Sequence, residues 1–296
     1  MSAATSASTG RSYGVERVCR AWEVPRSSFY AQRAEVKPAT RAGKRGPKPK
    51  VSDPELLKLI RADLAASPFQ GEGHRKVWAR LKLVAGIRVS RKRVLRIMRE
   101  HALLSPHRVR RGQDLLHEGT ITTDAPNLMW GTDGARVQTV EDGWGWIFTA
   151  VEHWSAECVG FHVCKEGTRY AALEPIAMGL TRIYGSVEPD VARGLALRMD
   201  NGTQYIADHF LNQLRFWGIA PSFAFVEQPQ TNGVAERFNR TLKEQVIHGR
   251  IFRNLAEVRD AVAAFVELYN EEWRVEKLGF LTPCEAREQW HRREAA

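Results

Sequence analysis

Three acidic residues stand out because of where they fall in the sequence pattern. Asp133 lies in a segment rich in β-branched and aromatic residues, Asp200 closes a short apolar run, and Glu236 lies in a segment with helical spacing. Carboxylates are the ligands that hard divalent cations prefer. Two such cations about 4 Å apart can activate an attacking oxygen and stabilise a leaving oxygen at a phosphodiester bond. The three acids therefore predict a site for two Mg²⁺ ions, with Mn²⁺ as a substitute.

Each acid also has a simpler explanation. Asp133 fits an exposed strand residue, Asp200 fits an Asn-Gly hairpin turn in the run MDNG, and Glu236 fits a surface charge on a helix. Taken singly, each of these explanations is as good as a metal site. Together they are weaker, because an acid that closes an apolar strand is uncommon and here two further acids lie in compatible positions.

The elements that would position these acids follow from the spacing of apolar residues after residue 125. We expect strands at residues 130–140, 145–151, 158–164, 196–199 and 221–226, and helices at residues 168–184, 204–217, 232–248 and 254–273. This order predicts an α/β layer with helices packed on a mixed sheet. Strand ends and packed helices hold side chains more rigidly than loops, which suits a metal site.

The basic residues are concentrated in the first third of the chain. Of the 296 residues, those at 1–112 include 26 Lys and Arg against 8 Asp and Glu, whereas those at 113–296 include 18 against 26. The net charge of +10 thus combines a basic segment with an acidic remainder. Such a surplus indicates binding to a polyanion, and we expect double-stranded DNA. A basic protein without a nucleic-acid partner is the alternative that the charge leaves open.

The first 52 residues divide into two segments. Residues 13–34 predict a helix, a break, and a second short helix that Ser27 or Ser28 caps. This is the plan of a helix-turn-helix segment, although two packed structural helices explain it too. Residues 35–52 contain KRGPKPK, whose prolines, glycine and cations predict an extended basic linker, lying along DNA or simply solvated.

Residues 53–111 predict a helical DNA-binding domain. Asp53 is expected to cap its first helix and Ser90 its third. The third helix carries cations in its first turn, where the helix macrodipole disfavours them. Contact with DNA would offset that cost, whereas the alternative is a plain charged face. The residues of this helix expected to contact DNA are Arg91, Lys92, Arg93 and Arg96.

Simpler features exclude several classes of protein. No run of about 18 apolar residues is present, so the sequence predicts no membrane span. The N-terminus has no apolar h-region, and the four cysteines show neither CxxC spacing nor a zinc pattern. We therefore expect a protein of a reducing cytoplasm.

Three motifs connect these observations to a known family. They are PN-x2-W-x2-D ending at Asp133, DNGTQY beginning at Asp200, and NGVAERFNRTLKEQ containing Glu236, and positions 201–235 make an interval of 35 residues between the last two acids. The sequence resembles the second reading frame of the IS3 family of bacterial insertion sequences, within the retroviral-integrase superfamily. The resemblance implies an α/β fold with a ribonuclease H-like DDE catalytic domain at residues 125–290, behind N-terminal all-helical DNA-binding modules.

The resemblance also implies an activity. It indicates a DDE-type DNA transposase of the bacterial cytoplasm, associated with the nucleoid, that cleaves strands at insertion-sequence ends and transfers the freed 3′-OH to target DNA. At least two copies are expected on DNA, together with a DNA-binding protein or fusion from an upstream reading frame. Two alternatives stay open: a transposase-derived DNA-binding regulator or assembly factor without cleavage activity, and a ribonuclease H-like nuclease that only hydrolyses.

The helix around Glu236 predicts further contacts. Asn232, Arg240 and Lys243 fall on the same helical face as Glu236, so we expect all three to contact DNA. In the family a basic residue seven positions after the glutamate contacts the element end, and Lys243 fills that place. A salt-bridged helix surface is the alternative.

The sequence also departs from the family in two places. The family often carries an Arg-x-His element after a Tyr-Asn pair, whereas this chain reads Trp-Arg-Val-Glu at positions 273–276. Many relatives have an aspartate after the second strand, whereas this chain has Glu152 and His153. The sequence leaves open whether Glu152 approaches the metals.

Overall fold

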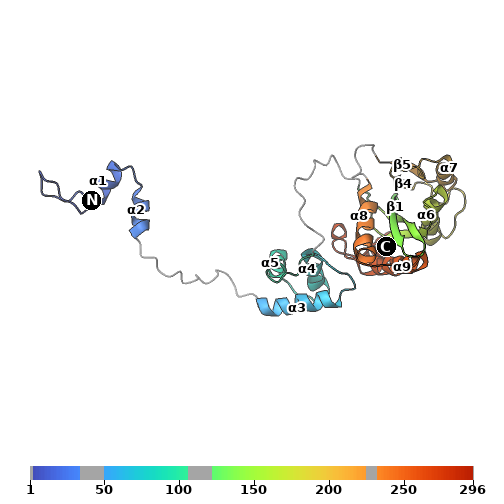
Figure 1. Ribbon diagram of the computed structural model, residues 1–296, viewed down its shortest axis with the longest axis horizontal. Coiled ribbons are helices and arrows are strands. Elements are labelled where there is room, and N and C mark those ends of the chain that lie inside the picture. Colours follow the sequence, from blue (N-terminus) through green and yellow to red (C-terminus); the bar gives the residue numbers. More distant parts are fainter. Residues whose placement is uncertain (1–2, 34–49, 106–121, 225–231, 296) are drawn as a thin grey trace. The chain divides into compact units, whose positions relative to one another are not determined.

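The computed structural model describes residues 3–33, 50–105, 122–224 and 232–295, which belong to two compact units, Met1–Val51 and Ser52–Ala296 (Figure 1). The first unit contains α1 (Gly14–Ala21) and α2 (Arg26–Arg33), which confirms the two expected short helices. Ser27 and Ser28 lie inside α2, so neither caps it as expected. The basic linker expected at residues 35–52 falls outside the described residues except for its last three positions.

Three helices open the second unit: α3 (Asp53–Ala66), α4 (His74–Leu83) and α5 (Arg91–Glu100). Their apolar faces meet in a small core, and its buried residues are Leu56, Ile60, Val77, Leu81, Val94, Ile97 and Met98. Ser90 caps α5 as expected, since its hydroxyl accepts the Arg93 N–H at 3.3 Å. The expected cap of α3 is wrong by one residue, because the Ser52 hydroxyl accepts the Glu55 N–H and Asp53 is already helical.

Five strands form one mixed sheet: β1 (Met129–Thr139), β2 (Gly143–Glu152), β3 (Cys158–Cys164), β4 (Ala196–Met199) and β5 (Ala220–Phe223). Their order is β3-β2-β1-β4-β5, with β1, β2 and β3 antiparallel and β4 and β5 parallel to β1. This arrangement confirms the mixed α/β sheet of a ribonuclease H-like core.

Helices cover both faces of the sheet because alternate strand residues point to opposite sides. Trp130, Phe148 and Leu197 pack in one apolar cluster with α6 (Arg169–Tyr184) and α7 (Asp208–Phe216). Val137, Ile147, Val151 and Val163 pack on the other face with α8 (Gly233–Leu242) and α9 (Leu255–Glu272). Figure 1 shows α8 on one side of β1 and α6 on the other.

Three elements differ from the expectation. The helix expected from residue 204 begins at Asp208, because residues 203–207 form turns. The helix expected to run to residue 248 ends as α8 at Leu242 and continues as a π-helical turn, Lys243–Ile247. A C-terminal helix, α10 (Pro283–Glu294), was not expected, and a short 3₁₀ turn, Glu276–Leu278, precedes it. None of the described helices is long and apolar enough to cross a membrane.

Candidate active site

The sheet brings Asp133 and Asp200 to neighbouring positions. β1 and β4 are parallel neighbours, with Gly131 paired to Arg198, and the same register two residues further along aligns Asp133 with Asp200. Neighbouring strands lie about 4.8 Å apart. Asp200 follows β4 and is exposed, and its carboxylate accepts the Gly202 N–H at 2.9 Å. The hairpin alternative for the run MDNG is wrong, because β5 pairs with β4 in parallel and α7 separates them.

Two hydrogen bonds orient the Asp133 carboxylate. The Gly134 N–H donates to Oδ1 at 2.8 Å, and the Asn239 side-chain amide donates to Oδ2 at 2.9 Å. Asn239 is itself held, since its carbonyl accepts the Thr149 hydroxyl at 3.0 Å. Asn239 lies on α8 three residues after Glu236, so the helix that carries the third acid also positions the first. Sequence reasoning missed Asn239, although its i+3 spacing from Glu236 was a signal that could have found it.

The three acids act on one another electrostatically. Burial raises the pKa of Asp133, and the negative charge of Asp200 adds to this effect, while the bonds from Asn239 and Gly134 and the charge of Lys243 oppose it. Burial also raises the pKa of Glu236, and the charges of Asp133 and Asp200 add to it, against the opposing charge of Arg240. The structure therefore brings all three predicted acids within electrostatic reach of one another, from β1, the end of β4 and α8.

A divalent cation fits the chemistry of this donor set. Within the described ranges, no three His, Cys, Asp or Glu side chains stand close enough together to form a metal site as they are. Close carboxylates repel one another, and each raises the pKa of its neighbour. A hard cation with oxygen ligands offsets that repulsion, and Mg²⁺ accepts one or two carboxylates with water and phosphate in its other positions. Asp133, Asp200 and Glu236 are thus residues that could hold metal.

Comparisons with known proteins agree with this geometry. The family described as integrase core domain matches residues 217–283, and the one described as HTH-like domain matches residues 53–111. A transposase of insertion sequence element IS629 from Shigella sonnei is 26% identical over 229 residues, covering 74% of each chain. The transposase InsD of insertion element IS2 from Escherichia coli is 26% identical over 233 residues, covering 77% of each chain. The chain is thus similar to insertion-sequence transposases over about three quarters of its length.

Solved structures of integrases are also similar to this chain. The catalytic core domain of BIV integrase is 22% identical with a TM-score of 0.40, over 57% of this chain and 99% of that one. The simian T-cell lymphotropic virus intasome chain is 17% identical with a TM-score of 0.44, over 72% and 73%. The integrase core and the transposase relatives confirm the expected resemblance to the IS3 family and make the protein a DDE-type polynucleotidyl transferase that acts on DNA.

Two cations of the chain lie beside the acids as the helical spacing predicts. Arg240 is exposed on α8 and acts electrostatically on Glu236, and Lys243 acts on Asp133. The expectation that Asn232 also contacts DNA is wrong. Its side chain is only 3% exposed and donates to the Thr132 carbonyl at 2.9 Å, so it binds β1 and presents no surface to DNA.

The cations of α5 are mostly occupied by acids of the chain itself. Arg93 and Arg96 both bind the Asp53 carboxylate at 2.5 Å, and Arg91 pairs with Glu276 at 3.3 Å. Asp53 therefore offsets part of the cost of placing cations at the N-terminus of α5. Lys92 is exposed, and no ion pair involves it in the described part of the chain.

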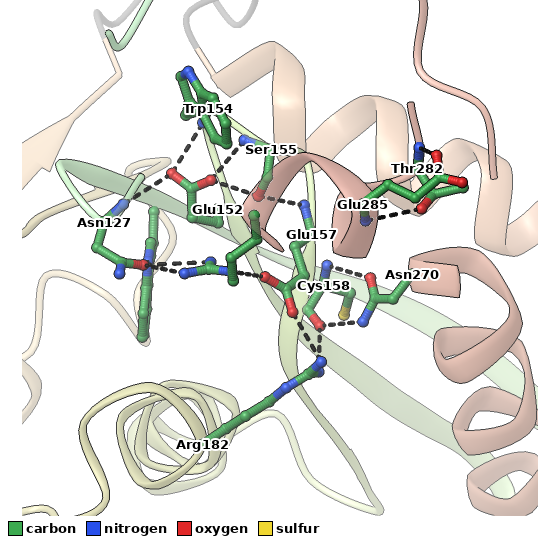
Figure 2. Close-up of polar contacts among 12 residues, drawn as sticks. Asn127, Glu152, Trp154, Ser155, Glu157, Cys158, Arg182, Asn270, Thr282 and Glu285 are labelled. Carbon is green, nitrogen blue, oxygen red and sulfur yellow. Dashed lines mark hydrogen bonds and ion pairs between the residues drawn. The ribbon is translucent and has the colours of Figure 1, made fainter. Parts of the chain in front are cut away.

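Glu152 does not approach the three acids. Figure 2 shows its carboxylate facing the turn that follows β2, where it accepts N–H groups from Asn127, Trp154 and Ser155 at 3.3, 2.9 and 2.6 Å. The Ser155 hydroxyl donates to it as well, at 2.6 Å. Glu152 therefore stabilises the buried turn after β2 and is occupied there by hydrogen bonds, away from the predicted metal ligands.

Proposed function

We propose that this transposase cleaves DNA strands at the ends of its insertion sequence and transfers the freed 3′-OH to target DNA, with Asp133, Asp200 and Glu236 holding two Mg²⁺ ions. The observation that supports this most directly is geometric: the β1–β4 register aligns Asp133 with Asp200, and α8, which carries Glu236, bonds the Asp133 carboxylate through Asn239. The charges of Asp133 and Asp200 also raise the pKa of Glu236, after the larger effect of its burial. Mn²⁺ would serve in place of Mg²⁺ because it accepts the same oxygen ligands.

The chain's own residues have separate tasks in this proposal. When bound, the two cations supply Lewis-acid charge to the attacking and leaving oxygens. Asn239 and the Gly134 N–H hold the Asp133 carboxylate in one orientation, so that its oxygens do not have to reorder when metal and DNA arrive. Arg240 and Lys243 lie along the edge where the DNA phosphates would pass, and they would neutralise phosphate charge there.

The remaining modules would bind DNA away from the cleaved bond. The HTH-like domain at residues 53–111 would contact the element end through the exposed Arg91 and Lys92. Arg93 and Arg96 would contact DNA only by exchanging their Asp53 partner for a phosphate. The segment at residues 13–34 would be a second helix-turn-helix-like contact, joined by the basic linker at residues 35–52. Two element ends must be held together, so at least two copies would assemble on DNA, with an upstream-frame protein or fusion supplying further end recognition.

An assay of cleavage and joining on element-end DNA with Mg²⁺ tests the proposal. We expect the wild-type chain to cleave and join, and Asp200→Asn to do neither while it still binds the DNA. Asp190→Asn is the matched control, because Asp190 is exposed and pairs only with Arg193 in the described structure. If Asp200→Asn cleaves as well as Asp190→Asn, the metal assignment is wrong.

The same assay decides the alternative. A DNA-binding regulator or assembly factor would bind element ends and show no cleavage with Mg²⁺ or Mn²⁺ in the wild-type chain. A purely hydrolytic nuclease would cleave the DNA and leave the 3′-OH unjoined in the presence of target DNA.

A further inference from the structure

Two buried polar side chains converge on Gly131, which lies in β1 two residues before Asp133 and therefore on the same face of the sheet. A Cβ at Gly131 would lie 2.9 Å from Asn232 Oδ1, 3.0 Å from His153 Nε2 and 3.3 Å from the Ala235 Cβ. Asn232 and His153 are each only 3% exposed. Neither Asn232 Oδ1 nor either ring nitrogen of His153 has a hydrogen-bond partner among the described residues.

Asn232 occupies an unusual place for its residue type. It precedes α8 at the N-cap position, where an asparagine side chain ordinarily accepts an N–H of the first helical turn. Here the side chain makes no such bond, and its amide donates instead to the Thr132 carbonyl at 2.9 Å. The start of α8 is therefore attached to β1 next to Asp133, one helical turn before Glu236.

His153 is held beside this attachment by its backbone. Its N–H donates to the Met129 carbonyl at 2.9 Å, and its carbonyl accepts the Lys277 ammonium. Burial lowers the pKa of its imidazole to about 4, and the positive charges of Lys277 and Arg198 add to the effect. The ring is thus neutral at physiological pH, with one nitrogen that donates and one that accepts.

We propose that His153 is a positioning residue that acts through Asn232: its Nε2 hydrogen is donated to one water, which donates in turn to Asn232 Oδ1, and this bridge fixes the start of α8 and hence Glu236 against Asp133. The two atoms lie 2.9 and 3.0 Å from the same point beside Gly131 and so are less than about 6 Å apart. A water can bridge polar atoms at such separations where they are too far apart to bond directly. A buried acceptor without a donor is costly, and one water that accepts from the imidazole and donates to the amide oxygen satisfies both groups.

The role of Gly131 follows from the same geometry. Any side chain at this position would meet Asn232, His153 and Ala235 at once, and α8 would have to move away from β1. The absence of a Cβ therefore lets the first turn of α8 approach the sheet at the level of the acids. The effect on metal binding rests on the proposed function, whereas the hydrogen bond itself does not.

Nitrogen-15 NMR of the His153 ring in the full chain tests the hydrogen bond. We expect the neutral tautomer with the hydrogen on Nε2, and a changed Nε2 shift in Asn232→Ala. A ring that carries its hydrogen on Nδ1, or an Nε2 shift that Asn232→Ala leaves unchanged, would overturn the proposal.

Calorimetric titration of the full chain with Mn²⁺ alone tests the positioning role. We expect His153→Leu to weaken Mn²⁺ binding on the order of tenfold, as removal of a residue that orients a metal ligand does. His153→Gln keeps an N–H donor at a similar reach and should restore binding. In the Asn232→Ala background, His153→Leu should cause no further loss.

The outcomes separate this proposal from the proposed function. If His153→Leu lowers the melting temperature and leaves Mn²⁺ binding unchanged, the residue is only structural and the positioning role is wrong. If His153→Gln binds Mn²⁺ as weakly as His153→Leu, the donated hydrogen is not what matters and the proposal fails. If the wild-type chain binds no Mn²⁺ and cleaves no DNA, but Asn232→Ala still changes the His153 Nε2 shift, the proposed function fails and the hydrogen bond stands.

Discussion

The ion cluster around Glu157 yields a stability prediction whose size follows from burial. The Glu157 side chain is only 2% exposed, and Arg287 of α10, itself 13% exposed, binds it at 2.5 Å. Arg182 of α6 binds the other carboxylate oxygen at 2.8 Å and is 43% exposed. Glu157 therefore ties two helices to the end of β2 and the start of β3, and Arg287→Met removes the more buried of its two partners.

The expected cost comes from the charge that is left behind. Removing one partner of a buried ion pair typically costs about 3–5 kcal/mol, because the other charge stays buried and unpaired. Glu157 keeps Arg182, which reaches solvent, so we expect the lower end, about 3 kcal/mol. For a domain of this size each kcal/mol lowers the melting temperature by about 2–4 °C, which makes a decrease of about 6–12 °C.

Thermal unfolding followed by circular dichroism measures this difference, and α10 supplies the matched control. Arg292→Met removes an arginine from the same helix whose partner, Glu288, is 64% exposed, so we expect a change of less than about 1 kcal/mol. Adding Glu157→Gln to Arg287→Met should recover part of the loss, since it removes the uncompensated charge. Equal melting temperatures for Arg287→Met and Arg292→Met would show that burial does not set the cost and would refute the reasoning.

Three further predictions follow from other parts of the fold. The pKa of His153 is about 4 in the folded state and about 6.5 in the unfolded chain, so the unfolded chain takes up the proton first as pH falls. The free energy of unfolding should therefore decrease by about 3 kcal/mol between pH 6.5 and pH 4. Urea unfolding measures this decrease, and His153→Gln should lack it. Gly160→Ala should cost about 3 kcal/mol, because its Cβ would lie 2.0 Å from the Pro175 carbonyl oxygen. Gly73→Ala has nothing within 4 Å and changes only the N-cap of α4, so it should cost no more than about 1 kcal/mol in the same measurement. Lys92→Ala should reduce the slope of log K against log salt for DNA binding by about 1, and an unchanged slope in titrations at several salt concentrations would remove Lys92 from the interface.

Much of the sheet could be predicted from the sequence because its signals are local. The strands at residues 158–164 and 196–199 have the expected bounds, since each is a short apolar run between turn residues. The helix α6 begins where Thr168 caps it, with the hydroxyl accepting the Ala171 N–H at 3.2 Å. Period-2 and period-3.6 patterns and capping residues are all properties of a few consecutive positions.

The C-terminal helix shows what local apolar spacing does not reveal. In α10 only Pro283 and Ala286 are buried, so it has no apolar stripe to recognise. Its start is marked instead by a capping box, in which Thr282 and Glu285 bond reciprocally, and Arg287 fastens it to Glu157. The box is readable in the sequence, whereas the ion pair, between residues 130 positions apart, is not.

The same limit explains the errors at the candidate site. Helical spacing places Asn232 and Arg240 on one face, but it does not say what that face meets. The first of them meets β1 and is buried, and the second meets solvent. Likewise, Arg93 looked available for DNA because its partner, Asp53, lies 40 residues away in the chain.

The interval of 35 residues between Asp200 and Glu236 has no chemical meaning by itself. It contains α7 and β5, and its length matters only because it returns the chain to the α8 face of the sheet. What brings the acids together is the register of β1 with β4 and the close approach of α8 at Gly131. A methyl group added at Gly131 should therefore weaken Mn²⁺ binding, because it forces the first turn of α8 away from β1. Mn²⁺ titration of Gly131→Ala measures this, with Gly73→Ala as the control because nothing lies within 4 Å of its added Cβ. Equal binding by the two variants would show that the close approach of α8 does not set the site.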